Sequence, residues 1–293
     1  MYMLKRFMVF SLCILVMTAF LGCVTPEANL NRGNSPAESL RPGFDVVYRP
    51  QIPPGKTWNS VLADLQQALR GVTWAYLAED YLTYRWPRVV RNLAFLSNRL
   101  EILHEREYNM DSKTFTLFYY QLINSTIVVE SARDNRQGRY AIILPEMVTF
   151  RKTDLTAAKR FADALFFIQQ QVKNVMKDYD ERLVLFEPIA ARYRALATKP
   201  TVSEEQRKLI VQANVLAQQK QYDKAISRYQ EVIKLDQTVY PEAYFNMALL
   251  AAQDNLPVTA IFFMRHYLLL KPDAKDARSA KDKIYEWEFT IKK

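Results

Sequence analysis

The last third of the chain repeats itself with a period of 35 residues, and no other feature constrains the fold so strongly. Residues 206–237 read QRKLIVQANVLAQQKQYDKAISRYQEVIKLDQ, and residues 241–273 read PEAYFNMALLAAQDNLPVTAIFFMRHYLLLKPD. The two copies align when Ala225 is superimposed on Ala260. A repeat of this length is typical of a two-helix unit that stacks on its neighbour to bury a shared core.

Alanine stands at equivalent places in both copies, where the two helices of each unit are expected to cross. Antiparallel helices approach closely only where their side chains are small. We therefore expect Ala213 to face Ala225, and Ala248 to face Ala260. The larger residues beside these alanines fill the remaining space. The pattern predicts two closely packed helix pairs.

The residues of the repeat resemble those of the tetratricopeptide repeat, whose usual period is 34 residues. In the second copy, Tyr244, Met247 and Ala248 occupy the family's large, large and small positions, and Pro272 closes the unit. The positions of the first copy that match the family are Leu209, Ala213, Leu216, Ala225 and Tyr229. The residues that depart from the usual types are Gln212, Pro257 and Tyr267.

The resemblance implies a concave surface that is formed by the first helix of each pair and binds a peptide or a helix of another protein. The matching positions are Ile210, Asn214, Ala217, Gln218, Phe245, Leu249, Ala252 and Gln253. We expect five of them to contact the partner, namely Asn214, Gln218, Phe245, Leu249 and Gln253. For Phe245 and Leu249 the alternative is packing on the upstream domain.

Two repeats alone bury little surface, so flanking helices are expected on both sides. Residues 273–289 have a polar outer face, and Asp273 is placed to begin such a capping helix. On the other side, residues 180–198 have helix-like apolar spacing and could form a degenerate preceding helix pair. The repeat region is therefore predicted to span residues 179–293.

Near its start the chain has two basic residues followed by an apolar stretch, residues 7–20. A helix needs about 20 residues to cross a bilayer, so this stretch is too short to span one and fits a secretory signal peptide. Gly22 then precedes Cys23, and this junction resembles the lipobox of bacterial lipoproteins. The resemblance implies that residues 1–22 are removed and that Cys23 is acylated. The alternative is an uncleaved anchor or a buried helix.

The segment that follows, residues 23–54, is rich in proline and polar residues and has few groups to bury. A flexible coil of this length would reach about 30 Å. We therefore expect a tether, with the folded part of the chain beginning near Trp58. An upstream domain is predicted over residues 55–178.

Along the upstream domain, the spacing of apolar residues changes from that of helices to that of strands. Residues 58–70 predict a helix, and a second helix is expected after Pro87 because apolar residues recur there every three or four positions. These apolar residues are Val90, Leu93, Leu96, Leu100 and Leu103. Strands are then predicted in TFTLFYYQLI, in a hairpin within STIVVESARDNRQGRYAIILP, and in EMVTFRK.

Asp154 is placed to cap a long amphipathic helix after these strands. The predicted fold class is α+β and mainly α, with a small antiparallel sheet and its helices followed by a tetratricopeptide-like helical repeat region.

The sequence lacks the residues for a nucleotide-binding loop and for a metal site. Only Gly71 and Gly138 follow residue 55, so the folded part has no glycine-rich loop for a phosphate. His104 and His266 are the only histidines, which leaves no set of histidines and cysteines for a metal site. We therefore predict no metal and no cofactor.

The acidic pairs Glu79/Asp80 and Glu105/Glu107 are the remaining candidates for acid/base chemistry. Adjacent acids on predicted helices are usually solvated, so we predict no catalytic residues and no enzymatic activity.

Together these features predict a membrane-anchored envelope lipoprotein that acts as a scaffold or assembly factor through its repeats. The partner would be an envelope protein of unknown identity, and the lipid on Cys23 would hold the chain at the membrane. Val24 is not the Asp associated with inner-membrane retention, which favours the periplasmic side of the outer membrane.

The chain carries 40 Lys and Arg against 31 Asp and Glu, and most of this excess lies before residue 203. The basic upstream domain could contact an acidic partner or anionic lipid, or simply be solvated. Nucleic acid is disfavoured for a secreted, tethered protein. The alternative function is a lipid or hydrophobic-ligand carrier that uses the α+β domain. Its aromatic residues would line a cavity or form plain core, and they are Trp74, Tyr76, Tyr81, Tyr84 and Trp86.

Overall fold

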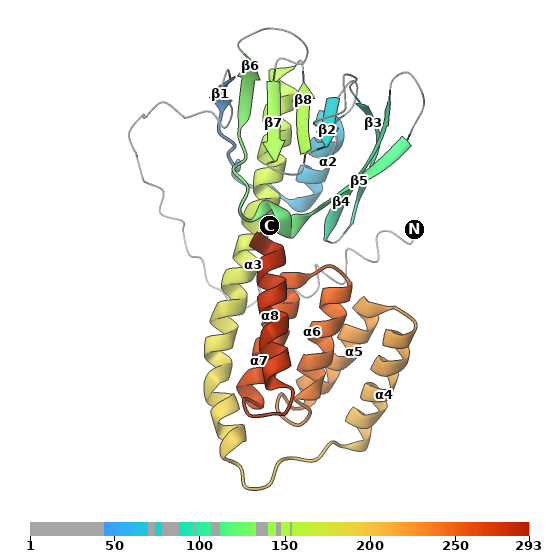
Figure 1. The fold of residues 1–293 in the computed structure, drawn as a ribbon, viewed down its shortest axis with the longest axis vertical. Coiled ribbons are helices and arrows are strands. Elements are labelled where there is room, and N and C mark those ends of the chain that lie inside the picture. The colour runs from blue at the N-terminus through green and yellow to red at the C-terminus, as the bar shows by residue number, and fades with distance from the viewer. Residues whose placement is uncertain are drawn as a thin grey trace, which may run out of the picture. The chain divides into compact units, whose positions relative to one another are not determined.

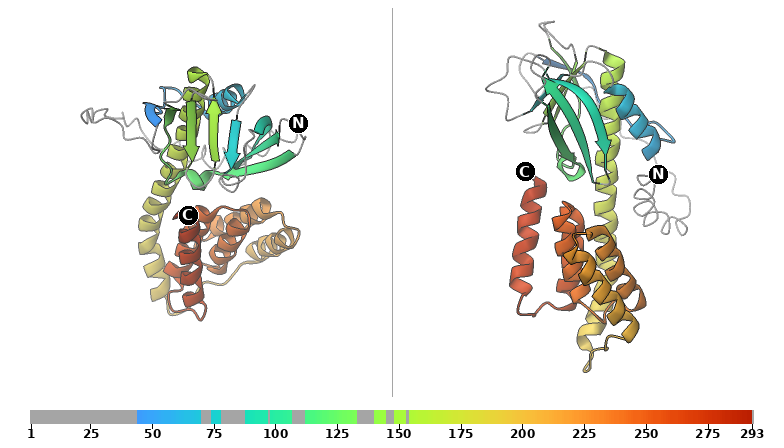
Figure 2. Two further views of the ribbon diagram at one scale, coloured as in Figure 1. Left: turned by 45° about the horizontal axis from the view of Figure 1, so that its top comes forward. Right: turned by 90° about the vertical axis from the view of Figure 1, so that its right-hand side faces the viewer.

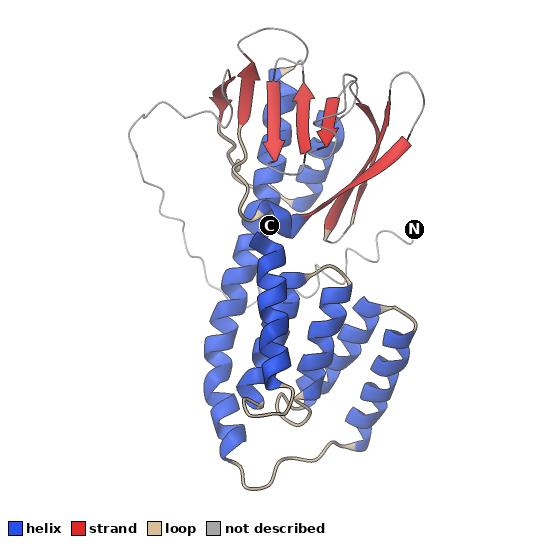
Figure 3. Ribbon diagram, viewed as in Figure 1, coloured by secondary structure: helices blue, strands red, loops and turns tan. Residues whose placement is uncertain are grey.

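The computed structural model describes residues 44–69, 74–77, 88–96, 98–106, 112–132, 140–144, 148–152 and 154–292. The chain divides into two compact units, one of residues 1–117 with 126–167 and the other of residues 118–125 with 168–293. Strands and two helical segments form the first unit, and helices form the second (Figure 3). The predicted class, α+β and mainly α, is confirmed.

An eight-stranded sheet with the order β1-β6-β7-β8-β2-β3-β4-β5 forms the first unit. The strands are β1 (Phe44–Tyr48), β2 (Trp74–Leu77), β3 (Arg88–Phe95), β4 (Arg99–Arg106), β5 (Ser112–Phe118), β6 (Val129–Ala132), β7 (Tyr140–Leu144) and β8 (Val148–Lys152). From β1 to β4 in this order, each strand pairs antiparallel with its neighbour. The predicted antiparallel sheet is present, and it is larger than expected.

Helix α2 (Trp58–Ala68) and the first turns of α3 (Leu155–Ala195) lie on one side of this sheet (Figures 1 and 2). Their apolar faces are buried at Leu65 and Phe161, as is Ile142 of β7. The ring of Trp58 packs edge-on against Phe167, with 5.4 Å between the ring centroids. The helix predicted over residues 58–70 is confirmed.

Residues 88–106 form the hairpin of β3 and β4, so the helix predicted after Pro87 is wrong. Next to the ends of the two strands, the N–H of Leu96 donates a hydrogen bond of 2.9 Å to the carbonyl oxygen of Arg99. The pairing runs from Arg88 with Arg106 to Phe95 with Leu100.

The spacing of apolar residues in this segment does not distinguish a helix from a strand, because one of its two strands is irregular. On β4, Leu100 and Ile102 are buried whereas Glu101 between them is partly exposed, as expected of a strand. On β3, however, the pairing register shifts between Val90 and Asn92. Such a shift interrupts the alternation of side chains that identifies a strand. The leucines at 93, 96, 100 and 103 are spaced three or four positions apart, as in a helix, although they lie in or beside strands.

The described fold begins at Phe44, earlier than the sequence predicted. Residues 44–48 pair with β6, so the last part of the predicted tether belongs to the sheet. Residues 1–43, which include Cys23 and the rest of the predicted tether, lie outside the described residues.

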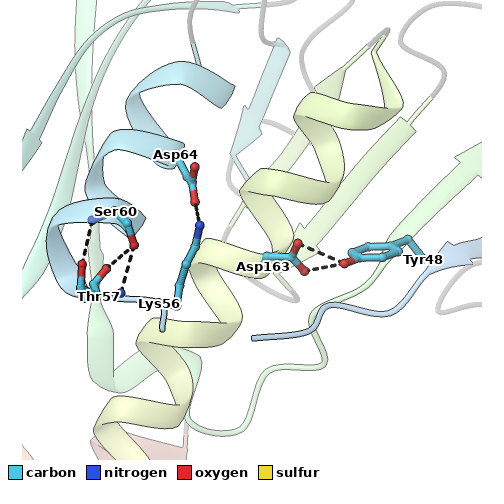
Figure 4. A network of polar contacts seen from close by, with 6 residues as sticks. All are labelled: Tyr48, Lys56, Thr57, Ser60, Asp64 and Asp163. Carbon is cyan, nitrogen blue, oxygen red and sulfur yellow. Dashed lines mark hydrogen bonds and ion pairs between the residues drawn. The ribbon is translucent and has the colours of Figure 1, made fainter. Parts of the chain in front are cut away.

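Tyr48 attaches the end of β1 to α3 (Figure 4). Its hydroxyl donates to the carboxylate of Asp163 at 2.8 Å, and the N–H of Gln51 donates to the same carboxylate at 2.8 Å. Burial, together with this hydrogen bond and the negative charge of Asp163, raises the pKa of Tyr48 to about 12. These hydrogen bonds attach the connection between β1 and α2 to α3.

A capping box begins α2 (Figure 4). The N–H of Ser60 donates to Oγ1 of Thr57 at 3.3 Å, and the N–H of Thr57 donates to Oγ of Ser60 at 3.0 Å. These bonds satisfy two backbone donors that a helix start leaves unpaired. Lys56 also forms an ion pair with Asp64 in the second turn.

Asp154 caps α3 as predicted. Its carboxylate accepts hydrogen bonds from the N–H groups of Thr156 at 2.9 Å and Ala157 at 3.2 Å. From there α3 continues for 41 residues to Ala195. The helix pair predicted within residues 180–198 is therefore wrong, because most of this segment belongs to a single helix.

Pro188 lies inside α3 on an exposed side and does not end the helix. The helix ends at a side-chain cap. Nζ of Lys199 donates to the carbonyl oxygens of Tyr193, Arg194 and Leu196 at 2.9, 3.0 and 2.7 Å. This cap also places the positive charge of Lys199 at the negative end of the helix dipole.

The second unit contains the last turns of α3 and five further helices. These are α4 (Glu204–Gln218), α5 (Tyr222–Leu235), α6 (Glu242–Gln253), α7 (Pro257–Leu270) and α8 (Ala277–Lys292). The short 3-10 helix η3 (Tyr119–Leu122) also belongs to it. Within the described ranges, no helix has the length and apolar character needed to cross a membrane.

Gln169 of α3 attaches η3 to the second unit. This side chain is buried, and its Nε2 donates to the carbonyl oxygen of Ser125 at 2.7 Å and also to that of Leu122. Nδ2 of Asn124 in the same segment donates to the carbonyl oxygen of Ile291 at 3.2 Å. These hydrogen bonds attach residues 118–125, which lie between β5 and β6 in the sequence, to α3 and α8.

The capping helix predicted near the end of the chain is present as α8. Ala277, Ala280 and Ile284 form its buried face. It begins after Asp276, so the prediction that Asp273 starts the helix is wrong. In the connection between α7 and α8, the N–H of Ala274 donates to the carbonyl oxygen of Lys271, and the N–H of Ala277 donates to that of Ala274.

Candidate partner-binding surface

The second unit is built from two antiparallel helix pairs, α4 with α5 and α6 with α7 (Figure 1). Ala213, Ala225, Ala248 and Ala260 are all fully buried within these pairs. Helices of one pair can approach closely where only methyl groups separate them. The role predicted for these alanines agrees with their burial.

A chain of hydrogen bonds runs across three successive helices. The hydroxyl of Tyr229 on α5 donates to Oδ1 of Asn214 on α4 at 2.6 Å, and it accepts from Nδ2 of Asn246 on α6 at 3.0 Å. The Tyr229 side chain is otherwise buried, and this burial raises the pKa of its hydroxyl. The bonds therefore fix α4, α5 and α6 relative to one another.

Asn214, Gln218 and Gln253, three of the five residues predicted to contact a partner, are exposed. Asn214 already accepts the bond from Tyr229, while in the described part of the chain its Nδ2 has no hydrogen-bond partner. An exposed amide that is held in place on one side can donate to the backbone carbonyl of a bound peptide. Asn214 and Gln218 lie on α4, and Gln253 ends α6.

Phe245 and Leu249 are partly buried against the core of the second unit itself. The ring of Phe245 packs edge-on against Tyr267 of α7, with 5.1 Å between centroids. Each side chain leaves part of its surface exposed beside the amides. The two residues therefore contribute both to the fold and to the apolar part of the candidate surface.

The sequence did not indicate Asn246 as a residue of this region, nor the hydrogen-bonding role of Tyr229. Asn246 directly follows Phe245 on α6, and Tyr229 is a large core position of the repeat. An amide next to a predicted contact residue is a signal that could have been read from the sequence. The pairing of Asn246 with Tyr229 could not, because it depends on the angle between α5 and α6.

Tyr267 stands where the family usually has a small residue, and the structure explains the exchange. Its ring is buried beside Phe245, and its hydroxyl donates to Oδ1 of Asp276 at 2.6 Å. Burial and the nearby carboxylate raise the pKa of Tyr267. The large side chain thus links α6, α7 and the start of α8.

His266 lies in an aromatic cluster that joins α3 to the repeats. Its ring stacks on Tyr244 at 5.1 Å and contacts Phe186 of α3 at 4.6 Å and Phe262 at 4.4 Å. Burial lowers the pKa of His266 to about 4, although a hydrogen bond with the carbonyl of Phe262 opposes the shift. A buried, neutral ring of this kind packs as a core residue.

The described residues hold no side-chain cluster suited to metal binding. Among the described residues, no group of three or more His, Cys, Asp and Glu side chains could hold a metal ion. Glu105 accepts a hydrogen bond of 3.0 Å from the hydroxyl of Ser112. The other acids of the two candidate pairs, Glu79, Asp80 and Glu107, lie outside the described residues.

Most of the aromatic residues predicted to line a cavity in the α+β domain also lie outside the described residues. Trp74 and Tyr76 lie on β2, and the other three aromatic residues, Tyr81, Tyr84 and Trp86, are not described.

Comparison with known proteins identifies a TPR (tetratricopeptide) repeat at residues 213–254, which cover the last turns of α4, all of α5 and all of α6. No curated protein matches the chain, and no solved structure matches it. The TPR repeat confirms the class of the helical region. It also supports a role in protein–protein interaction, because such repeats are typically interaction modules without catalytic activity.

Proposed function

We propose that the second unit binds a peptide or a helix of a partner protein across the surface formed by α4 and α6. The observation that carries this proposal is the combination of a TPR repeat with exposed amides at Asn214, Gln218 and Gln253 beside Phe245 and Leu249. Apolar positions supply buried area to such a partner, and amides can pair with its backbone.

The exposed amides offer the cleanest test of this surface. Gln218→Lys with Gln253→Lys is expected to lower recovery of a crosslinked partner from native cells about tenfold, because two long cations would replace two amides in the interface. Both side chains are exposed, so the fold should be unaffected. Recovery would be measured by quantitative mass spectrometry after affinity purification.

A matched control carries the same added charge away from the surface, as Gln67→Lys with Gln237→Lys, both exposed in the structure. Equal partner recovery from the two double variants would refute the proposed surface. Leu249→Asp provides a second test of its apolar part, with circular dichroism to verify that the helices persist. Phe245 is less suitable, since its ring packs on Tyr267.

We further propose that the chain is anchored to the cell envelope by lipid on Cys23, with the repeats serving as a scaffold or assembly factor there. The support is the sequence alone, in which Gly22 and Cys23 follow a short apolar stretch. The outer membrane, on its periplasmic side, is the favoured place, and the partner is then an envelope protein.

Cys23→Ser is expected to abolish incorporation of labelled palmitate and to reduce the share of the chain in the membrane fraction severalfold, because acyl chains supply the membrane affinity. The matched control is Cys13→Ser, which lies in the apolar stretch and should leave both measurements unchanged. Palmitate incorporation that survives Cys23→Ser would contradict the anchor.

A further inference from the structure

The last turns of α3 carry apolar residues on two opposite faces. One face is buried against the repeats and consists of Leu183, Phe186, Ala190 and Tyr193. The opposite face consists of Val184, Leu185, Pro188, Ala191 and Ala195, and we call it the outer stripe. All five residues of the outer stripe are exposed, Val184 to 64% and Leu185 to 72%.

The outer stripe differs from the same face one turn earlier. There the helix presents Lys177 and Glu181, both exposed, as expected of a helix surface in water. The apolar character begins at Val184 and continues to Ala191, before Arg192. Singly exposed apolar residues are ordinary, but a contiguous apolar helical stripe of this kind marks a contact surface.

Charges of opposite sign stand at the two ends of the stripe. Glu181 lies at its start and Arg192 near its end, on the same side of the helix. Eleven positions separate them, which is about 16 Å along the axis. Glu181 makes only a long, exposed contact of 3.8 Å with Lys177. Among the described residues, Arg192 has no ion-pair or hydrogen-bond partner, so both charges can pair elsewhere.

We propose that the first half of the outer stripe, Val184, Leu185 and Pro188, binds the same residues of a second copy of this chain, with the two α3 helices antiparallel. A two-fold axis between residues 186 and 187 places Glu181 opposite Arg192 of the partner subunit, and repeats this pair at the other end. Leu185 then lies beside Pro188 of the partner subunit. A two-fold interface of this kind needs a surface that complements itself, and the charge pattern meets that condition.

The charge pattern also selects the direction of the two helices. In a parallel pair, Glu181 would face Glu181 of the partner subunit, and Arg192 would face Arg192 of the partner subunit. Like charges in contact disfavour that arrangement.

The size of the stripe predicts a weak dimer. The paired segment from Glu181 to Arg192 is about 16 Å long, which gives an interface below the usual size of specific protein contacts. We therefore expect a Kd of about 1–100 µM. The proposal does not depend on the partner surface of α4 and α6, because the outer stripe uses a different helix.

Sedimentation equilibrium of the full chain in a density-matched detergent tests the proposal. Leu185→Asp should raise the dimer Kd at least about tenfold, because a carboxylate would be desolvated in the seam. Arg192→Glu should raise it severalfold, and so should Glu181→Arg. The double variant Glu181→Arg with Arg192→Glu should restore the Kd to within about twofold, since it re-forms both pairs in reverse.

Matched controls carry the same changes elsewhere. Lys234→Glu alters an exposed charge of α5, and Val211→Asp alters an exposed valine of α4. Neither should change the Kd. The proposal is overturned by a chain that stays monomeric at about 100 µM, by a dimer that Leu185→Asp leaves intact, or by a double variant that fails to restore pairing. A dimer weakened equally by Val211→Asp would also overturn it.

Discussion

Replacing Ala260 by Leu is expected to destabilise the repeats by about 2–3 kcal/mol. Ala260 is fully buried on α7, in the helix pair that α7 forms with α6. An isobutyl group has no space where two backbones approach through methyl groups, so α7 would have to move away from α6. Met247 and Ala248, which are also fully buried, would then lose part of their packing.

Hydrogen exchange measured by mass spectrometry can follow this change in the second unit alone. Amides of α6 and α7 should lose protection by a factor of about 30–150, while those of α2 in the first unit should be unchanged. Ala252→Leu is the control, because Ala252 is a partly exposed alanine of α6 and can accept a larger side chain. Equal protection of Ala260→Leu and the natural chain would show that the two helices are not in close contact there.

Acidification from pH 6.5 to 4 is expected to cost the repeats about 3 kcal/mol through His266 alone. Its pKa in the folded chain is about 4, because burial disfavours the charged ring, while the unfolded chain has the ordinary value of 6.5. Between these values the unfolded state binds more protons than the folded state. The stability is therefore complete above pH 6.5 and is lost as the pH falls toward 4.

Urea unfolding followed by circular dichroism at several pH values measures this loss. His266→Phe keeps an aromatic ring among Phe186, Tyr244 and Phe262 but removes the titrating group. The natural chain should lose about 3 kcal/mol more than this variant over the same pH range, since carboxylates contribute alike to both. Parallel curves for the two proteins would contradict a depressed pKa. With only two histidines in the chain, NMR can assign the titration directly.

Much of the helical region could be predicted from its residues. The 35-residue period locates α4 to α7, and the capping chemistry of Asp154 locates the start of α3. These features are local, because caps, turns and amphipathic faces depend on residues a few positions apart. The five predicted contact residues lie on α4 and α6, and their role in binding stays a prediction.

The errors concern segments whose local pattern allows two structures. The spacing of Val90, Leu93 and Leu96 fits a helix, yet pairing with β4 makes this segment a strand. Residues 44–48 read as tether until β6 provides hydrogen-bond partners for them. In both places the energy comes from backbone pairing with distant residues, which a local pattern cannot reveal.

The sequence by itself determined the period of the repeats, the small residues at their helix crossings and the cysteine at which we expect the chain to be anchored. Only the tertiary structure decided that residues 88–106 are strands, that α3 covers the repeats with one apolar face, and that its other face stays exposed. The reason is physical. Local chemistry sets which side chains share a face of a helix, but what that face meets depends on packing between elements that are far apart in the chain.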